Sequence, residues 1–210
     1  MIYTKRSLGQ NFLKDLNIIK KITGITKIVN KDVVEIGPGE GALTNEIVKN
    51  NPKSLTLIEK DDSLFKKLKV KYSNNNKVKI YNEDILKFNL EEKIKKNTII
   101  FGNLPYNISS QILVKIVRFK KWPPKYSALI FMFQKEMADR ILAKFGTSHY
   151  GRLSILTSYR LQMFNKFNVS PNCFYPKPRV FSTVLYLKPR DQIFYKIKNL
   201  ENLEKITNIL

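Results

Sequence analysis

The chain has 210 residues, of which 43% are hydrophobic and 11% aromatic, which is enough apolar material for one full-sized globular domain. No apolar run approaches the roughly 20 residues that span a bilayer, and the start, MIYTKRSLGQNFL, lacks the apolar core of a signal peptide. These features argue against a membrane-spanning or exported protein. We therefore expect a soluble, cytoplasmic protein without a membrane partner.

The charge balance is strongly basic. The 38 Lys and Arg outnumber the 17 Asp and Glu, giving a formal net charge of +21 that attracts polyanions over much of the surface. Nucleic acid is therefore the leading partner. A generic basic surface is the alternative, because Lys, Asn and Ile are abundant and only seven of the basic residues are Arg. Biased codon usage would replace Arg with Lys, but it gives no reason for the scarcity of acidic residues.

The sequence gives no support to a disulfide or a metal site. Cys173 is the single cysteine, which rules out an internal disulfide and agrees with a reducing compartment. His149 is the single histidine, so a zinc site of His and Cys ligands is implausible. We predict no metal, a structural or surface position for His149, an inert Cys173, and a monomer.

From residue 31 onward, short apolar strands alternate with segments in which apolar residues recur every three or four positions. The predicted strands are residues 33–36, 54–59, 77–81, 97–101 and 127–133. The predicted helices are residues 43–50, 62–72, 109–119 and 134–145. This alternation predicts an α/β fold with a mainly parallel sheet and helices on both faces.

The remainder of the chain follows another pattern. Two β-rich stretches, residues 153–164 and 180–188, come after the last predicted helix. Between them, residues 170–179 (SPNCFYPKPR) contain three prolines, which exclude regular structure and predict a turn. The final segment has helical periodicity but no partner to pack on. We therefore predict one domain at residues 1–189 and the beginning of a second at residues 190–210.

A glycine-rich motif, EIGPGEGAL at residues 35–43, directly follows the first predicted strand. Gly37, Gly39 and Gly41 let the backbone turn sharply and approach a ligand closely, at the start of a helix whose free N–H groups face that ligand. In a doubly wound sheet, ligands bind at this carboxyl edge of the strands. The motif alone is ambiguous, because GPGEGA also fits the dinucleotide pattern of dehydrogenases.

Two acidic residues follow the next strands at the same edge. Glu59 closes the second predicted strand, where its carboxylate could accept hydrogen bonds from both ribose hydroxyls of NAD or of S-adenosylmethionine. Asp84 follows the third strand, where it could accept from an adenine amino group while Ile85 covers the ring. Either acid alone would suggest a solvated loop residue, but together they favour a nucleotide-type ligand.

The fourth strand runs into GNLPYNISS, residues 102–110, which could hold a second adenine. An adenine amino nitrogen is a poor nucleophile because its lone pair is delocalised into the ring. The side-chain oxygen of Asn103 and the carbonyl of Leu104 could accept from its two N–H bonds and favour a pyramidal nitrogen. Pro105 restrains Leu104 to extended geometry, and Tyr106 could stack on the base. The alternative is an ordinary Asn-Pro turn with Tyr106 in the core.

These motifs together resemble one family, the ribosomal RNA adenine dimethyltransferases. SLGQNFLKD, VEIGPGEGALT, GNLPYNISS, YGRLSIL and FYPKPRVFS occur in the family's order within residues 7–188. The resemblance implies a Rossmann-like, class I S-adenosylmethionine-dependent methyltransferase fold with a seven-stranded sheet. NLPYNISS and YGRLS indicate the small-subunit branch, which implies dimethylation of two adjacent adenosines near the 3′ end of 16S rRNA during ribosome biogenesis.

The resemblance also implies roles for individual residues. Asn11 and Leu13 of GQNFL would close over the methionine end of S-adenosylmethionine. The remaining cofactor contacts would be Gly37, Gly39, Glu59, Asp84, Ile85 and Asn103. Phe174 would sandwich the target base against Tyr106, with a core phenylalanine beside a turn as the alternative.

Two departures from the family pattern bear on these expectations. The family usually has Lys-Val-Asp-Ser after the proline turn, whereas this chain has Arg-Val-Phe-Ser at residues 179–182, past the proposed base contact. Only the first part of the family's helical C-terminal domain fits into residues 190–210, which implies a truncated or incomplete domain. We expect catalysis to survive its loss more readily than docking on the ribosomal subunit.

Three alternatives stay open. A large-subunit methylase that confers macrolide resistance would share the chemistry and act on 23S rRNA. A non-catalytic RNA-binding or transcription factor could retain the fold, although the intact NLPY motif argues against it. A dehydrogenase would explain the glycine motif but neither NLPY nor the positive charge.

Overall fold

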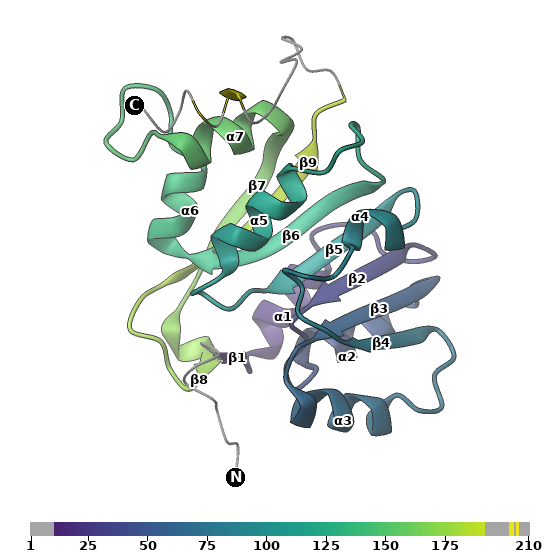
Figure 1. Ribbon diagram of the computed structural model, residues 1–210. Helices are drawn as coiled ribbons and strands as arrows, with labels where there is room; N and C mark the ends of the chain where they lie inside the picture. Colours follow the sequence, from purple (N-terminus) through teal and green to yellow (C-terminus); the bar gives the residue numbers. More distant parts are fainter. Residues whose placement is uncertain (1–10, 192–201, 204, 206–210) are drawn as a thin grey trace.

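A twisted seven-stranded sheet forms the centre of the computed structural model, which describes residues 11–191, 202–203 and 205 (Figure 1). The strands lie in the order β4-β3-β2-β5-β6-β9-β7. Their bounds are β2 (Asp32–Ile36), β3 (Ser54–Glu59), β4 (Val78–Asn82), β5 (Thr98–Asn103), β6 (Tyr126–Gln134), β7 (Leu161–Val169) and β9 (Ser182–Pro189). The five strands predicted before residue 134 are therefore confirmed.

The direction of the strands positions the site. Strands β2 to β6 pair in parallel, whereas β9 lies antiparallel between β6 and β7. The prediction of a mainly parallel, seven-stranded sheet is thus confirmed. Because parallel strands end at one edge of a sheet, the loops that follow β2, β3, β4 and β5 converge there.

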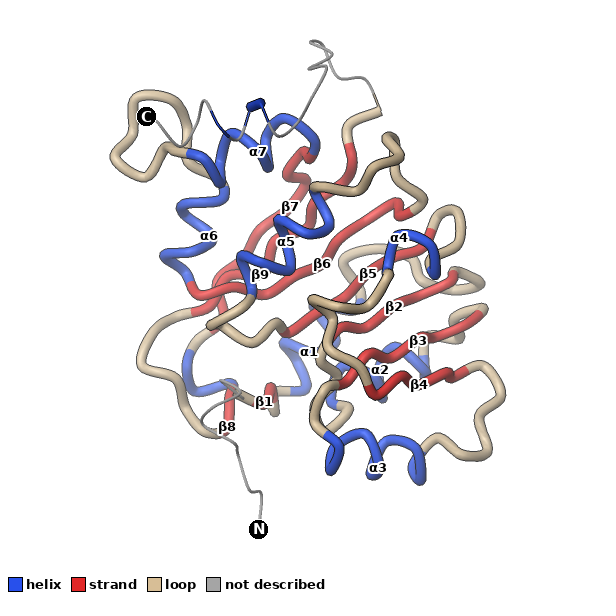
Figure 2. The backbone as a smooth tube through the Cα atoms, in the orientation of Figure 1, coloured by secondary structure: helices blue, strands red, loops and turns tan. Residues whose placement is uncertain are grey.

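Helices cover both faces of this sheet (Figures 1 and 2). Their bounds are α1 (Leu16–Thr23), α2 (Ala42–Lys49), α3 (Asp62–Lys71), α4 (Leu90–Lys93), α5 (Ser109–Val117), α6 (Lys135–Ile141) and α7 (Arg152–Arg160). In the view of Figure 1, α4, α5, α6 and α7 lie in front of the sheet, whereas α1 and α2 lie behind it. The four helices predicted from periodicity correspond to α2, α3, α5 and α6.

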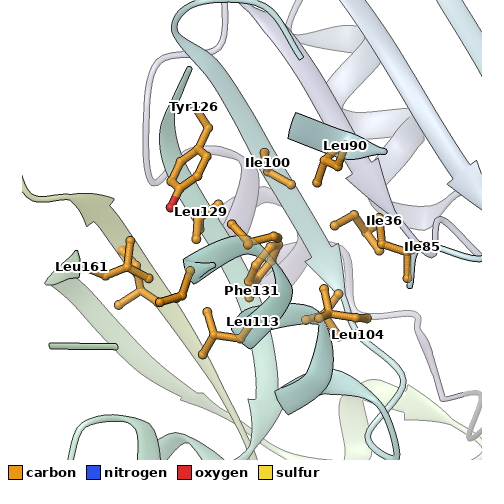
Figure 3. Close-up of a cluster of buried hydrophobic side chains, with 14 of the residues drawn as sticks. Ile36, Ile85, Leu90, Ile100, Leu104, Leu113, Tyr126, Leu129, Phe131 and Leu161 are labelled. Atoms are coloured by element: carbon orange, nitrogen blue, oxygen red, sulfur yellow. The ribbon is translucent and has the colours of Figure 1, made fainter. Parts of the chain in front are cut away.

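Strand β6 shows how the sheet divides the apolar core in two. On the side of α5, α6 and α7, shown in Figure 3, its buried residues are Leu129, Phe131 and Phe133. On the side of α1 and α2, they are Ala128, Ile130 and Met132. Side chains alternate between the faces of a strand, so a strand covered on both sides needs the continuous apolar run that β6 has.

Helix α1 was not among the predicted elements, and a local cap explains where it begins. The Asp15 carboxylate accepts hydrogen bonds from the backbone N–H groups of Asn17 at 2.9 Å and Ile18 at 3.0 Å. Such an N-cap contributes about 1 kcal/mol. The cap starts α1 directly after Leu13, so the segment that contains Asn11 is anchored to a helix that packs under the sheet.

The β-rich reading of residues 153–164 is wrong for its first part, because residues 152–160 form α7 and β7 begins only at Leu161. In the helix, Leu156 is buried in the core beside α5. At its C-terminal end, the Arg160 guanidinium donates to the carbonyls of Val117 at 2.5 Å and Phe119 at 2.7 Å, which lie at the end of α5. Tertiary packing has overridden the β propensity of this segment.

The prediction that residues 170–179 have no regular structure is also corrected. A 3-10 helix covers Pro171–Cys173, and the two-residue strand β8 (Phe174–Tyr175) follows it. Strand β8 pairs antiparallel with β1 (Phe12–Leu13). Proline is compatible with the first position of a helix, since that position needs no N–H bond. The small β1–β8 sheet joins the GQNFL segment to the proline turn.

Two further predictions concern the C-terminal domain and the absence of a membrane-spanning segment. Most of the predicted second domain at residues 190–210 lies outside the described residues; of those described, Leu203 is partly buried and packs against the core cluster on the α5 side of the sheet. Among the described residues, no helix is both long and apolar enough to cross a bilayer.

Candidate active site

A cavity of about 390 Å³ opens at the carboxyl edge of the parallel strands. The predicted site residues that line it are Asn11, Leu13, Gly37, Gly39, Glu59, Asp84, Ile85, Asn103, Leu104, Pro105 and Tyr106. Residues from the chain start, the glycine motif and three further strand ends therefore surround one space. Phe174 is the predicted site residue that does not line it.

The glycine motif forms the floor of the cavity. Its backbone has positive φ angles, which residues with a side chain rarely adopt. Gly39 has a φ of +59°, and a Cβ atom placed on it would lie 2.9 Å from Cε1 of Phe12. The Phe12 ring thus packs directly on the glycine loop. Gly37, with a φ of +65°, lies close to the NLPY turn, because its Cβ would be 3.9 Å from Cδ of Pro105.

Glu59 is held by the backbone on both sides. Its Oε2 accepts from the Gly39 N–H at 3.0 Å and its Oε1 accepts from the Asp61 N–H at 2.9 Å. Burial raises the pKa of this carboxyl, whereas hydrogen bonds from the backbone N–H groups of Asp61, Gly39 and Lys60 favour its charged form. A carboxylate offers about four acceptor positions, so acceptor capacity stays available for a ligand in the cavity.

Asp84 is an ionised acceptor at the next strand end. Lys60 Nζ donates to its Oδ2 at 2.8 Å, and the Leu86 N–H donates to its Oδ1 at 2.9 Å. The hydrogen bond from Lys60 lowers the pKa of the Asp84 carboxyl. The adjacent Ile85 is 6% exposed and supplies an apolar wall.

The Asn103 side chain is oriented by a hydrogen bond to a residue 92 positions earlier in the chain. Its Nδ2 donates to the backbone carbonyl of Asn11 at 3.0 Å. A carbonyl only accepts, so this contact settles which atom of the amide is nitrogen. The side-chain oxygen of Asn103 is therefore free of that bond and available as an acceptor at the cavity wall.

The turn after Asn103 is set by close packing. A Cβ atom on Gly102 would lie 2.5 Å from Cδ2 of Leu104, which itself is 1% exposed and belongs to the core shown in Figure 3. The Leu104 side chain thus folds back over the glycine into the core. Among the described residues, no backbone hydrogen bond uses the Leu104 carbonyl, so its oxygen is a second available acceptor beside that of Asn103.

Tyr106 lines the cavity and is anchored at its far end. Its hydroxyl lies 2.6 Å from Oγ of Ser182, which is fully buried at the start of β9. Burial raises the pKa of the Tyr106 hydroxyl, so the ring is neutral at physiological pH. The bond fixes the tip of a ring whose body faces the cavity.

Phe174 lies apart from this arrangement. It is 1% exposed, sits on β8 opposite Leu13, and packs in the core under α1 and α2. Its neighbour Tyr175 is 51% exposed. Stacking of Phe174 on a base therefore requires β8 to move out of the core, and the stacking role stays a prediction.

Among the residues of this site that sequence reasoning did not single out are Phe12, Ser182 and Glu35. Glu35 lines the cavity, is 1% exposed, and accepts a hydrogen bond from the Thr44 hydroxyl at 2.6 Å. Burial raises the pKa of the Glu35 carboxyl to about 8. An acidic residue in the otherwise apolar VVEI strand was the signal that could have identified it.

Neither a metal site nor a reactive cysteine appears in the described residues. They contain no group of three or more His, Cys, Asp or Glu side chains that could hold an ion. Cys173 is buried, and burial raises the pKa of its thiol. A thiol of this kind is a poor nucleophile.

Comparison with known proteins agrees with this geometry. A family model described as "Ribosomal RNA adenine dimethylase" matches residues 1–210. The chain is 46% identical over 208 residues to "Ribosomal RNA small subunit methyltransferase A" of Pelagibacter ubique, an alignment that covers 99% of this chain and 78% of that relative.

Solved structures show the same fold. A dimethyladenosine transferase from Plasmodium falciparum is 30% identical with a TM-score of 0.81, covering 94% of this chain and 70% of that one. The 23S rRNA methyltransferase ErmE is 26% identical with a TM-score of 0.75, covering 94% and 77%. The fold is thus that of the class I methyltransferases, and the chain belongs to the ribosomal RNA adenine dimethylase family of S-adenosylmethionine-dependent methyltransferases.

Proposed function

We propose that this protein dimethylates the exocyclic amino groups of two adjacent adenosines near the 3′ end of 16S rRNA, as a step of small-subunit biogenesis. The observation that carries the proposal is the fixed Asn103 amide, whose Nδ2 is held by the Asn11 carbonyl while its oxygen stays available beside the Leu104 carbonyl. The small-subunit assignment is supported by 46% identity to the small-subunit relative, against 26% to the large-subunit enzyme ErmE.

The cavity fits S-adenosylmethionine. Glu59 would accept from its ribose hydroxyls with the acceptor capacity that its backbone partners leave open. Asp84 would accept from its adenine amino group, and Ile85 would cover that ring. When bound, the cofactor supplies a methyl group already activated by the charge of its sulfonium. Asn11 and Leu13 line the same cavity and would contact the methionine end.

The protein's own contribution is to orient the target nitrogen. Asn103 and the Leu104 carbonyl would accept from the two N–H bonds of the adenine amino group and turn its lone pair outward. Pro105 keeps Leu104 extended, and the Leu104 side chain is anchored in the core. Tyr106, tethered through Ser182, would stack on the base. With these two acceptors, alignment and electrostatics would account for the catalysis without a strong base.

The second methylation differs from the first. A nitrogen that carries one methyl group has only one N–H left, so only one of the two acceptors can be used. Because the Asn103 amide is held through its nitrogen by Asn11, its oxygen stays in position in both rounds. We therefore propose that Asn103 makes the retained contact and that the Leu104 carbonyl loses its partner.

The test is methyl transfer from labelled S-adenosylmethionine to immature small ribosomal subunits. Asn103→Ala removes one acceptor, so we expect kcat to fall by about 100-fold or more while RNA binding is retained. Asn89→Ala is the matched control, because Asn89 is exposed and makes no side-chain cap to α4. Its kcat should equal that of the wild type.

Three outcomes would contradict the proposal. Methyl transfer by Asn103→Ala at the wild-type rate would show that the Asn103 side chain is not a catalytic acceptor. Methylation of naked large-subunit RNA alone would indicate a large-subunit methylase. Wild-type protein that binds small subunits and S-adenosylmethionine without transferring a methyl group would indicate a non-catalytic RNA-binding factor.

A further inference from the structure

We propose that one face of the edge strand β7 is a second RNA-binding surface, which holds unpaired nucleotides through base stacking and charge. This surface, the β7 strip, consists of Phe164 and Phe167 on β7, Lys188 on β9 and Lys21 on α1. The inference rests on the proposed function, because it assigns a contact to the RNA that carries the target adenosine.

Each phenylalanine of the strip has a lysine over its ring. Lys188 Nζ lies 4.3 Å from the ring centroid of Phe164, and Lys21 Nζ lies 4.2 Å from that of Phe167. The Phe164 ring also contacts Tyr186, at 5.9 Å between centroids. Tyr186 and Phe167 both pack against the core under α1 and α2, so the four members share this face of the sheet.

A β-bulge brings Phe164 to the surface. The register between β7 and β9 shifts between Met163 and Asn165, which leaves Phe164 as an extra residue on β7. Bulges re-aim side chains, and this one leaves the phenylalanine 51% exposed. An exposed aromatic ring is a stacking platform for nucleic-acid bases, since every base has a flat face, and Lys188, which lies over this ring, would turn from it to a phosphate when a base stacks there.

The charge around the strip favours RNA, a polyanion, over a protein partner whose surface carries both acidic and basic residues. Residues 140–190 contain nine Lys and Arg and no Asp or Glu. Within the described part of the chain, no carboxylate lies at ion-pair distance from Lys21 or Lys188. Both ammonium groups are thus able to approach phosphates, and the rings offer stacking without base-specific hydrogen bonds.

The strip also lies on a path that leads away from the active site. Val169, at one end of β7, pairs with Ser182, whose hydroxyl contacts Tyr106 at the cavity. Phe167 is two residues from Val169 along the strand, and Phe164 is five residues away, or about 16 Å in an extended strand. An RNA strand whose adenosine occupies the cavity could therefore continue along β7.

The test is equilibrium binding of a fluorescein-labelled oligouridylate, which contains no adenine for the catalytic cavity. We expect Phe164→Ala to weaken binding by about fivefold or more, the effect of losing one base stack. Phe164→Leu keeps an apolar side chain but no flat ring, so it should weaken binding similarly and serves if the alanine variant is unstable. Lys188→Gln should lower the slope of log K against log salt concentration by about 0.7.

The controls use a second lysine–phenylalanine pair, on α3. Lys69 Nζ lies 5.9 Å from the Phe65 ring centroid, and this helix packs beside β3 and β4, at the opposite end of the sheet from β7. Phe65→Ala and Lys69→Gln should bind oligouridylate like the wild type. Thermal unfolding and calorimetric titration with S-adenosylmethionine confirm that each variant is folded.

The outcomes separate the strip from the proposed function. The proposal of an RNA-binding strip is wrong if both Phe164 variants bind oligouridylate like the wild type, or if Phe65→Ala weakens binding as much as Phe164→Ala does. Either result counts against the strip even where the wild type methylates small subunits. Failure of the wild type to methylate any RNA overturns the proposed function, even where oligouridylate binds through the strip. A wild-type dimer that Phe164→Ala converts to a monomer in sedimentation would make the strip a self-association surface instead.

Discussion

At the scale of single residues, the site depends on two glycines that are required for different reasons. Gly39 combines a φ of +59° with the Phe12 ring packed against it, so both conformation and space exclude a side chain. Gly102 has no positive φ, and space alone excludes a Cβ there, because Leu104 and Phe131 lie against it. A substitution at Gly102 therefore tests the packing of the NLPY turn without backbone strain.

We expect Gly102→Ala to lower the free energy of unfolding by about 1–3 kcal/mol, the usual cost of overpacking a core. The new Cβ would lie 2.5 Å from Leu104 Cδ2, and since Leu104 is buried, the turn and its carbonyl must shift. Methyl transfer should fall with it. Gly151→Ala is the control, since nothing lies within 4 Å of its Cβ and its φ is −177°. Chemical denaturation of both variants measures the difference. Equal losses of unfolding free energy in the two variants would contradict the prediction.

The types of the site residues could be predicted from the sequence, but their contacts could not. Glycines and acids at the ends of successive strands indicate a ligand edge, because strand direction determines where those ends meet. The bond from Asn103 to the Asn11 carbonyl spans 92 positions in the chain, and no local pattern indicates it. Burial of Phe174 depends likewise on pairing between β1 and β8, two strands of two residues each.

At the scale of elements, strand β9 connects the active site to the far edge of the sheet. Its first residue, Ser182, bonds Tyr106, and its second, Thr183, donates a hydrogen bond to Asn168 on β7 at 2.9 Å. Two neighbouring hydroxyls thus tie one strand to the NLPY turn and to the edge strand. The pair allows the two connections to be broken separately.

We expect Ser182→Ala to lower kcat severalfold, because the Tyr106 ring loses its anchor, with little change in the KM for S-adenosylmethionine. Thr183→Val is the matched control, since it removes a β9 hydroxyl that bonds β7 instead. Ser182→Thr should restore part of the activity, because it returns a hydroxyl. Steady-state kinetics on immature small subunits measure these effects, and a Thr183→Val defect as large as that of Ser182→Ala would refute a specific positioning role.

The prediction of helices and strands succeeded where the hydrophobic pattern of each segment was clear. It failed where contacts with other elements determine the secondary structure. Strands β5 and β6 carry unbroken apolar runs, at residues 99–101 and 128–133, which only a strand covered on both faces needs. Residues 152–160 contain β-formers, yet the Gly151 N–H bonds the Ser154 hydroxyl at 3.0 Å, and Arg160 bonds the end of α5. These contacts select a helix, and the bond from Arg160 to Val117 joins residues 43 positions apart, so no short window of sequence indicates it.

At the scale of the whole molecule, the charges are distributed unevenly. The net charge is +21, and acids are missing from residues 140–190, which include α7, β7 and β9. Two of the acids that remain, Glu35 and Glu59, are buried close together at the cavity. The surface therefore favours RNA, while the buried carboxyls are placed where a small ligand binds, and their protonation is coupled to the stability of the fold.

This coupling gives the protein a pH-dependent stability with a definite sign. Burial raises the pKa of Glu35 to about 8, above its value in an unfolded chain, so folding favours the protonated form. The resulting stability is complete below about pH 4.5 and is lost as the pH rises toward about 8. Between about pH 6 and about pH 8, the free energy of unfolding of the wild type should fall by about 2 kcal/mol relative to Glu35→Gln, which cannot ionise. Urea denaturation across this range measures it. Glu136→Gln, which alters an exposed residue of α6, should follow the wild type, and parallel curves for the wild type and Glu35→Gln would show that Glu35 titrates alike in both states.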